Sequence, residues 1–187
     1  EVPDRFFEKF TSLEPKLRAR NPAQEDVPFT RAALAMCENI DWNVGRVLAK
    51  LDELKLRDNT IVLYFSDNGP NSWRWNGCMK GRKGSVDEGG LRVPLLVRWP
   101  GRIRPGTRIT RIAGAIDLLP TLTDMCRVPL VTTKPLDGTS VKPLLLGEAK
   151  NWPDRMIFSL QNKRISVRTQ RYRLDPAGAL FDLDEDP

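Results

Sequence analysis

Two short stretches of this sequence carry residues that could do chemistry, and the first follows an apolar run. Asp67, Asn68 and Gly69 come directly after the run Thr60–Ser66. Carboxylate and amide oxygens are hard donors that suit Ca²⁺ or Mg²⁺, and Gly69 would permit a tight turn that aims both side chains at one point. Asp-Asn-Gly is also a common turn tripeptide. The first stretch is therefore either a divalent-cation site or an ordinary turn.

The second stretch, Lys80–Ser85 (KGRKGS), is a loop that could bind an anion. Gly81 and Gly84 free the backbone to present N–H groups, and Lys83 between them is a compact charge that can reach a tetrahedral anion. The G-x-x-x-x-G-K-[ST] spacing of a P-loop is absent. A solvated basic turn is the alternative interpretation. Together the two stretches indicate either a metal ion beside an anionic substrate or two ordinary polar loops.

Four charged residues around Lys83 receive supporting roles. Lys80 and Arg82 flank the loop, where they could steer an anion towards it, and no catalytic part is assigned to them. Glu88 and Arg92 are interpreted as structural residues that pair with each other.

The net charge of +6 is concentrated in two parts of the chain. Residues 74–111 contain ten Lys or Arg and two acidic residues, and residues 155–173 contain six Lys or Arg and no acid. A nucleic-acid binder needs clustered cations, but no recognition-helix pattern, RNA-binding aromatic strand or zinc finger accompanies these. A basic cleft for a small or polymeric anion fits as well or better.

The composition excludes several classes of site and protein. The chain has no histidine, so it cannot by itself supply a Ser-His or Cys-His nucleophilic pair. Its three cysteines match neither a zinc spacing nor a disulfide framework. No apolar run approaches the roughly 20 residues of a membrane-spanning helix, and no signal peptide is visible. The first residue is not Met and the chain stops at FDLDEDP, so we expect a piece of a longer protein.

The spacing of apolar residues predicts an α/β fold. A long helix with one apolar face is expected to begin at Thr30 as its N-cap. Thr60–Ser66 is almost continuously apolar, as in a strand that is covered on both faces within a parallel sheet. The segment LRVPLLVRWPG after Gly90 predicts another short strand, and Asp117 could cap a helix through LLPTLTDMC. Brief strands from Arg155 onwards predict a small antiparallel sheet.

The order and spacing of these segments resemble the second half of the sulfatase family, in the alkaline-phosphatase-like superfamily. The most specific part is SDNGP, then KGRKGSVDEGGLRVP, then WPG. NIDWNVGRVLAKLDELKLRDNTIVLYFSDNG looks like the family's long helix and metal-ligand strand, and IDLLPTLTDM, LDGTSVKPLL and ALFDLDEDP look like its later landmarks. The resemblance covers nearly everything from about Arg31 onward. It implies part of a mostly parallel sheet flanked by helices in residues 1–150, followed by a small, truncated antiparallel subdomain in residues 151–187.

The resemblance also implies roles for individual residues. Asp67 and Asn68 would help to coordinate a divalent cation, usually Ca²⁺ and alternatively Mg²⁺. Lys83 matches the Lys of the R/K-G-x-K-G motif, which binds the sulfate group and stabilises developing charge. The family's nucleophile is a formylglycine hydrate made from the Cys or Ser of a C/S-x-P-x-R motif, which this chain lacks. We therefore expect the nucleophile and the remaining metal ligands upstream, and we expect this chain alone to be inactive.

The same residues leave two other functions open. One is a phosphoester or phosphonate hydrolase of the same superfamily, and the other is a non-catalytic polyanion-binding protein. If the protein is a sulfatase, its substrate is a sulfated small molecule or a sulfated polysaccharide; nucleic acid is not an expected partner. Because the family is mostly exported, a periplasmic, secreted or lysosomal location is expected.

Overall fold

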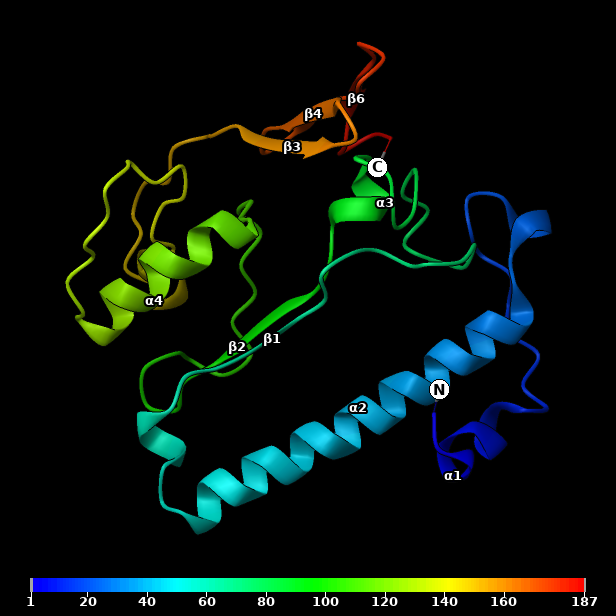
Figure 1. Cartoon of the computed structure of the whole chain (residues 1–187), viewed down its shortest axis with the longest axis horizontal. Helices are drawn as coiled ribbons and strands as arrows, with labels where there is room; N and C mark the ends of the chain where they lie inside the picture. Colours follow the sequence, from blue (N-terminus) through cyan, green and yellow to red (C-terminus); the bar gives the residue numbers. More distant parts are fainter. Residues whose placement is uncertain (1, 187) are drawn as a thin grey trace.

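The computed structural model describes residues 2–186 (Figure 1). It begins with a short helix, α1, Asp4–Phe7, and a 3-10 turn, Glu8–Phe10. Both contact the long helix α2, Val27–Glu53, and Phe6 is the buried residue of α1. Residues 4–10 of the chain thus pack against α2.

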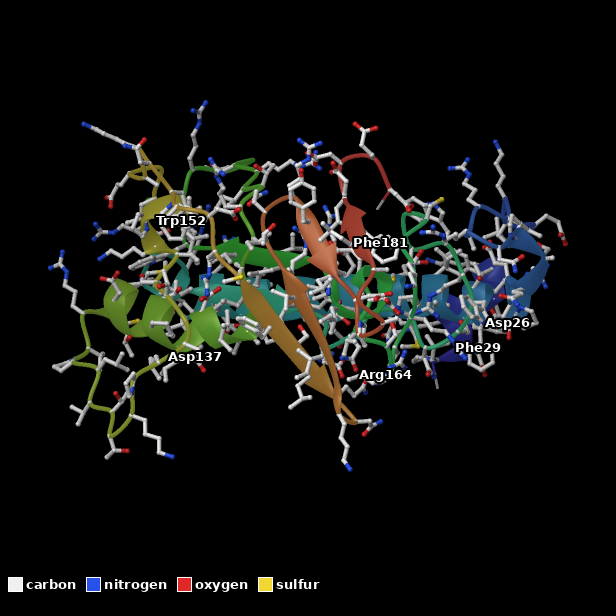
Figure 2. All side chains as sticks on the ribbon, turned by 90° about the horizontal axis from the view of Figure 1, so that it is seen from above. Asp26, Phe29, Asp137, Trp152, Arg164 and Phe181 are labelled. Carbon is white, nitrogen blue, oxygen red and sulfur yellow. The ribbon has the colours of Figure 1, made fainter. Side chains whose placement is uncertain are left out.

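Helix α2 begins earlier than the sequence predicts. The side chain of Asp26 accepts a hydrogen bond of 3.0 Å from the backbone N–H of Phe29, and the two residues lie together at the start of the helix (Figure 2). Asp26 is therefore the N-cap, and the predicted cap Thr30 lies within the helix. The prediction was wrong because Pro28 is tolerated in a first helical turn, where its missing N–H removes no hydrogen bond.

The apolar residues of α2 have the predicted helical spacing, but few of them are fully buried by the described residues. Ala35 is buried, whereas Met36, Val47 and Leu54 at the C-cap are exposed. A period of 3.6 determines which residues share a face, and it carries no information on what covers that face. No helix within residues 2–186 is both long enough and apolar enough to cross a membrane.

The strand that precedes the candidate metal site is β1, Val62–Phe65, and its partner is β2, Leu95–Arg98. The two strands pair antiparallel, with Val62 opposite Arg98 and Phe65 opposite Leu95. This pairing differs from the parallel arrangement that the apolar run predicts. A continuous apolar run indicates a strand that is covered on both faces, but it does not indicate the direction of the neighbouring strand. In Figure 1 the β1–β2 pair lies between α2 and helix α4, Leu118–Cys126.

A small apolar core lies where α4, Leu118–Cys126, meets α5, Lys142–Leu145. Met125, Val141 and Leu145 are buried there. Partly buried apolar residues pack against them: Ile61, Val97, Trp99, Ile103, Leu144 and Trp152. Residues 61 and 97 belong to the β1–β2 region, so this core joins the strand pair to the later helices.

Helix α4 spans the predicted segment LLPTLTDMC with Asp117 at its N-cap position, but the side chain of Asp117 makes no capping hydrogen bond to α4. Its carboxylate accepts hydrogen bonds of 2.8 Å from the backbone N–H of Gly114 and Thr139 and from Nη1 of Arg155. The predicted position is confirmed, and the side-chain cap is absent because the 3-10 turn Ala115–Asp117 runs directly into α4. The buried side chain instead joins three segments of the chain.

The last part of the chain forms a four-stranded sheet that lies beside α3, Glu88–Leu91 (Figure 1). Its strands are β3, Ile157–Gln161, β4, Arg164–Arg168, β5, Tyr172–Leu174, and β6, Leu180–Asp182. They are ordered β3-β4-β5-β6, and every neighbouring pair is antiparallel. The small C-terminal antiparallel sheet and the α/β class are therefore confirmed.

Candidate functional site

Asp67 and Asn68 lie one residue beyond the end of β1, and the chain then passes close to the backbone of α3. The N–H of Gly69 donates to the carbonyl oxygen of Gly90 at 2.9 Å. A Cβ atom on Gly69 would lie 1.8 Å from the carbonyl oxygen of Gly89, so no other residue fits there without a shift of the backbone. Gly69 is required for close approach, and its contact with α3 fixes where the two polar residues stand.

Lys83 lies on a loop that folds against the same glycines. Its backbone N–H donates to the carbonyl oxygen of Pro70 at 2.9 Å, and the N–H of Gly89 donates to that of Lys80 at 2.7 Å. Gly81 has a φ of 86°, in the left-handed region that favours glycine. These bonds bring the Lys83 loop against the chain that leaves β1.

The structure brings the predicted site residues together. Nζ of Lys83 lies 3.8 Å from Oδ2 of Asp67, and their side chains are 48% and 80% exposed. Nδ2 of Asn68 donates to the backbone oxygen of Asp67 at 2.7 Å, which leaves Oδ1 of Asn68 as the atom able to bind a cation. The carboxylate of Asp67 and the ammonium of Lys83 thus lie close together, and Asn68 is the next residue after Asp67 along the chain.

The donor set at this position suits part of a Ca²⁺ or Mg²⁺ site. Asp67 and Asn68 offer hard oxygen donors, but a calcium ion takes six to eight oxygen ligands. Among the described residues there is no group of three or more His, Cys, Asp or Glu that could hold a metal ion. The two residues therefore fit a divalent cation in chemistry and need ligands from elsewhere to complete its shell.

Lys80 and Arg82 both have partners within the described residues, and the steering of anions by these two cations stays a prediction. Nζ of Lys80 lies 2.9 Å from Oδ2 of Asp175 and 3.5 Å from Oδ1 of Asp87. The hydrogen bond with Asp175 is the main reason why the pKa of Lys80 is raised. Arg82 donates from Nη1 to a backbone oxygen at 3.1 Å, and its guanidinium lies over the ring of Trp73. Lys80 is thus engaged in binding the C-terminal sheet.

Glu88 is structural, as the sequence indicates, but its main partner is not Arg92. Arg92 lies 3.6 Å from Oε1 of Glu88, whereas Arg173 donates to Oε2 from Nη2 at 2.7 Å and from Nε at 2.9 Å. Nε of Arg168 lies 3.3 Å from the same oxygen, and burial lowers the pKa of Arg168. Sequence reasoning missed this cluster because 85 residues separate Glu88 from Arg173. The signal that could have found it is the acid-free basic stretch of residues 155–173.

Two family models match the chain, and together they span it. The sulfatase model matches residues 1–128, and the model of the N-sulphoglucosamine sulphohydrolase C-terminal region matches residues 82–187. The first covers more than half of the chain and includes the polar residues after β1 and the Lys83 loop.

Curated sulfatases from distant organisms are similar to the chain. Steryl-sulfatase of Rattus norvegicus is 40% identical over 140 residues, which are 70% of this chain and 24% of the relative. Arylsulfatase A of Homo sapiens is 38% identical over 145 residues, which are 72% of this chain and 28% of the relative. N-acetylgalactosamine-6-O-sulfatase of Bacteroides thetaiotaomicron is 30% identical over 183 residues, and the match covers 79% of this chain and 35% of the relative. The chain spans about a quarter to a third of the length of these relatives.

Solved structures agree with the sequence relatives. The structure of Ps i-CgsB in complex with k-i-k-neocarrahexaose is similar at a TM-score of 0.79 and 25% identity. The match covers 100% of this chain and 41% of that protein. The structure of a protein in complex with its substrate D-glucosamine-2-N,6-O-disulfate is similar at a TM-score of 0.65 and 25% identity. The match covers 84% of this chain and 34% of that protein. Because a family model matches most of the chain and several sulfatases share 30–40% of the aligned residues, the chain belongs to the sulfatase family.

Proposed function

We propose that this chain provides the metal- and sulfate-binding part of an enzyme that hydrolyses sulfate esters. The observation that carries the proposal is the distance of 3.8 Å between Nζ of Lys83 and Oδ2 of Asp67. An ammonium this close to a carboxylate that holds a cation would let the two positive charges contact one tetrahedral anion from two sides. Membership of the sulfatase family makes a sulfate group the first candidate for that anion.

Each site residue has a separate task in this proposal. Asp67 and Asn68 hold the cation through oxygen atoms, with Ca²⁺ as the first candidate and Mg²⁺ as the alternative. When bound, the cation supplies polarisation of the S–O bonds. Lys83 donates from Nζ to a sulfate oxygen and stabilises the negative charge that develops as the S–O bond to the leaving oxygen breaks. Lys83 is therefore both the substrate-binding and the catalytic residue of this chain.

The nucleophile of the proposed reaction is not in this chain. The sequence contains no C/S-x-P-x-R motif, from which the formylglycine of a sulfatase is made. We infer that residues 1–150 contribute the C-terminal part of the catalytic α/β domain and that residues 151–187 belong to a small antiparallel subdomain. This chain alone is then inactive, because the nucleophile and the remaining metal ligands come from another part of the protein.

The proposed substrate is a sulfated small molecule or a sulfated polysaccharide. Two similar structures contain a neocarrahexaose and a glucosamine disulfate. The ten cationic residues between positions 74 and 111 would raise the local concentration of a polyanion. A periplasmic, secreted or lysosomal location is proposed with it, and a relative from Drosophila melanogaster is named an extracellular sulfatase.

The experiment that tests the function is Lys83→Ala in the full-length protein. We expect kcat/KM for an aryl sulfate to fall roughly 10²-fold or more, because one group that stabilises the transition state is lost. Lys150→Ala removes an exposed lysine of the same type and serves as the control. Activity of Lys83→Ala equal to that of the wild type would exclude the role given to Lys83.

Comparing aryl sulfate with aryl phosphate distinguishes the other functions. A preference for the phosphate ester would assign the site to a phosphoester or phosphonate hydrolase. Salt-sensitive binding of a sulfated polysaccharide without turnover, and without any effect of a chelator, would assign it to a polyanion-binding protein.

A further inference from the structure

A buried ion pair joins α3 to the C-terminal sheet. Glu88 is 3% exposed and Arg173 is 5% exposed, and the guanidinium binds one carboxylate oxygen through two N–H groups. Nη1 of Arg173 also donates to the carbonyl oxygen of Val86 at 2.9 Å and to Oγ of Ser166 at 3.0 Å. Buried charges are tolerated when they are paired and hydrogen-bonded in this way. Their geometry is therefore closely defined.

A second contact joins the same sheet to the other side of the loop. Oδ2 of Asp175 lies 2.9 Å from Nζ of Lys80, while Oδ1 accepts hydrogen bonds of 2.9 Å from the N–H groups of Ala177 and Ala179. Asp175 is thus held by its own turn before it binds Lys80. The ammonium of Lys80 also lies 4.6 Å from the ring centre of Phe181, which is labelled in Figure 2.

The two contacts lie on either side of Lys83. Lys80 precedes Lys83 in the same loop, and Glu88 follows it at the start of α3. Arg173 and Asp175 are two residues apart, a spacing that puts both side chains on one face of an extended chain. The inner strand β5 and the residue that follows it therefore hold the Lys83 loop at two points.

We propose that Arg173 and Asp175 are positioning residues for Lys83, acting through Glu88 and Lys80. The proposal rests on the function proposed above and adds a role for the C-terminal sheet. The Lys83 side chain is half exposed and pairs with the still more exposed Asp67, so its place depends on its backbone. A displacement of about 1 Å in a group that binds the reacting anion can cost about 10²-fold in rate.

A double-mutant cycle in the full-length protein separates positioning from folding. The variants are Arg173→Lys, which keeps the charge and loses the planar fork, and Asp175→Asn, which keeps Oδ1 as an acceptor. Each is measured with Lys83 present and with Lys83→Ala. We expect each to lower kcat/KM about tenfold beside Lys83 and less than twofold in the Lys83→Ala background. A role in folding alone would give the same factor in both backgrounds and would overturn the proposal.

Amide hydrogen exchange gives a readout that needs no turnover. We expect exchange in residues 80–85 to quicken at least about tenfold in Arg173→Lys and Asp175→Asn, because the loop opens more often. Arg171→Lys is the matched control, since Arg171 pairs with Asp182 on the surface. Unchanged exchange in residues 80–85 would also overturn the proposal. Failure of the wild type to hydrolyse any sulfate ester would instead reject the proposed function, and the exchange result would still report on the loop.

Discussion

Nη1 of Arg155 lies 2.8 Å from Oδ1 of Asp117, and this ion pair ties the segment that leads into the C-terminal sheet to the start of α4. The side chains are 16% and 2% exposed. Asp117 also accepts from two backbone N–H groups, so a single carboxylate satisfies three donors.

Asp117→Ala is therefore expected to destabilise the protein strongly. Removal of one partner leaves a buried guanidinium and two backbone N–H groups unpaired, and we expect a loss of about 3–5 kcal/mol in the free energy of unfolding. Urea unfolding measures it. Asp124→Ala removes an exposed carboxylate whose partners are Lys142 and the hydroxyl of Ser140, and it should cost about 1 kcal/mol or less. Similar losses in the two variants would contradict the central role given to Asp117.

Two glycine-to-alanine substitutions are expected to act in opposite directions. Gly69→Ala would place its Cβ 1.8 Å from the carbonyl oxygen of Gly89, so the Asp67 turn and α3 must separate. Gly45 lies inside α2 with nothing within 4 Å of the position that a Cβ atom would take, and Gly45→Ala should stabilise by about 0.5–1 kcal/mol. Thermal unfolding should show a lower Tm for the first and a higher Tm for the second. A Gly69→Ala protein with unchanged Tm and activity would refute the required close approach.

The Lys80–Asp175 pair predicts a pH window of stability. The hydrogen bond from Lys80 is the main reason why the pKa of Asp175 is lowered, and the same bond raises the pKa of Lys80. The carboxylate stabilises the fold above its unfolded pKa of about 3.9 and loses this effect as pH falls through its folded value. The ammonium stabilises below its unfolded pKa of about 10.4 and loses this effect as pH rises through its folded value.

Asp175→Asn should therefore be less stable than the wild type by about 1.5–3 kcal/mol between about pH 5 and pH 9, nearer the lower value because Lys80 is partly exposed. Urea titrations at several pH values measure this difference. It should shrink below about pH 4, where Asp175 in the wild type becomes protonated. A difference that stays constant down to about pH 2 would show that the charge of Asp175 does not contribute.

Asp67→Asn is expected to weaken divalent-cation binding in the full-length protein. The substitution keeps the shape of the side chain and removes its charge, so the Ca²⁺ concentration for half-maximal activity should rise at least about tenfold. Isothermal titration with Ca²⁺ alone provides a second readout. Asp137→Asn, which changes an exposed carboxylate outside the site, is the control. Equal Ca²⁺ affinity in Asp67→Asn and wild type would remove Asp67 from the metal site.

The closeness of Asp67 and Lys83 was predictable from sequence because both residues lie within a short stretch, whereas their roles stay predictions. Asp67, Asn68 and Lys83 follow one strand and precede the next, so local turn chemistry and the glycine pattern suffice to bring them together. Gly69 was predicted to allow a tight turn, and the structure adds that it makes room for the backbone of Gly89. The α/β class and the C-terminal sheet followed from the change in apolar spacing.

The parts that were missed depend on distant partners. The order of charges along the sequence predicts that Glu88 pairs with Arg92. The buried Glu88 instead has Arg173 as its main partner, because the rigid guanidinium of Arg173 offers two N–H groups. The role of Lys80 likewise depends on Asp175, 95 residues away. The antiparallel pairing of β1 with β2 was missed for a related reason, because an apolar run does not indicate which neighbouring segment covers the strand.

The two contacts between the Lys83 loop and the C-terminal sheet also set an order of events during synthesis. Glu88 leaves the ribosome 85 residues before Arg173, and Lys80 leaves 95 residues before Asp175. At the usual rate of translation the delay is on the order of ten seconds. During that time the nascent loop has neither of these distant contacts, so both contacts that we propose to position Lys83 form only after residue 175 has been made.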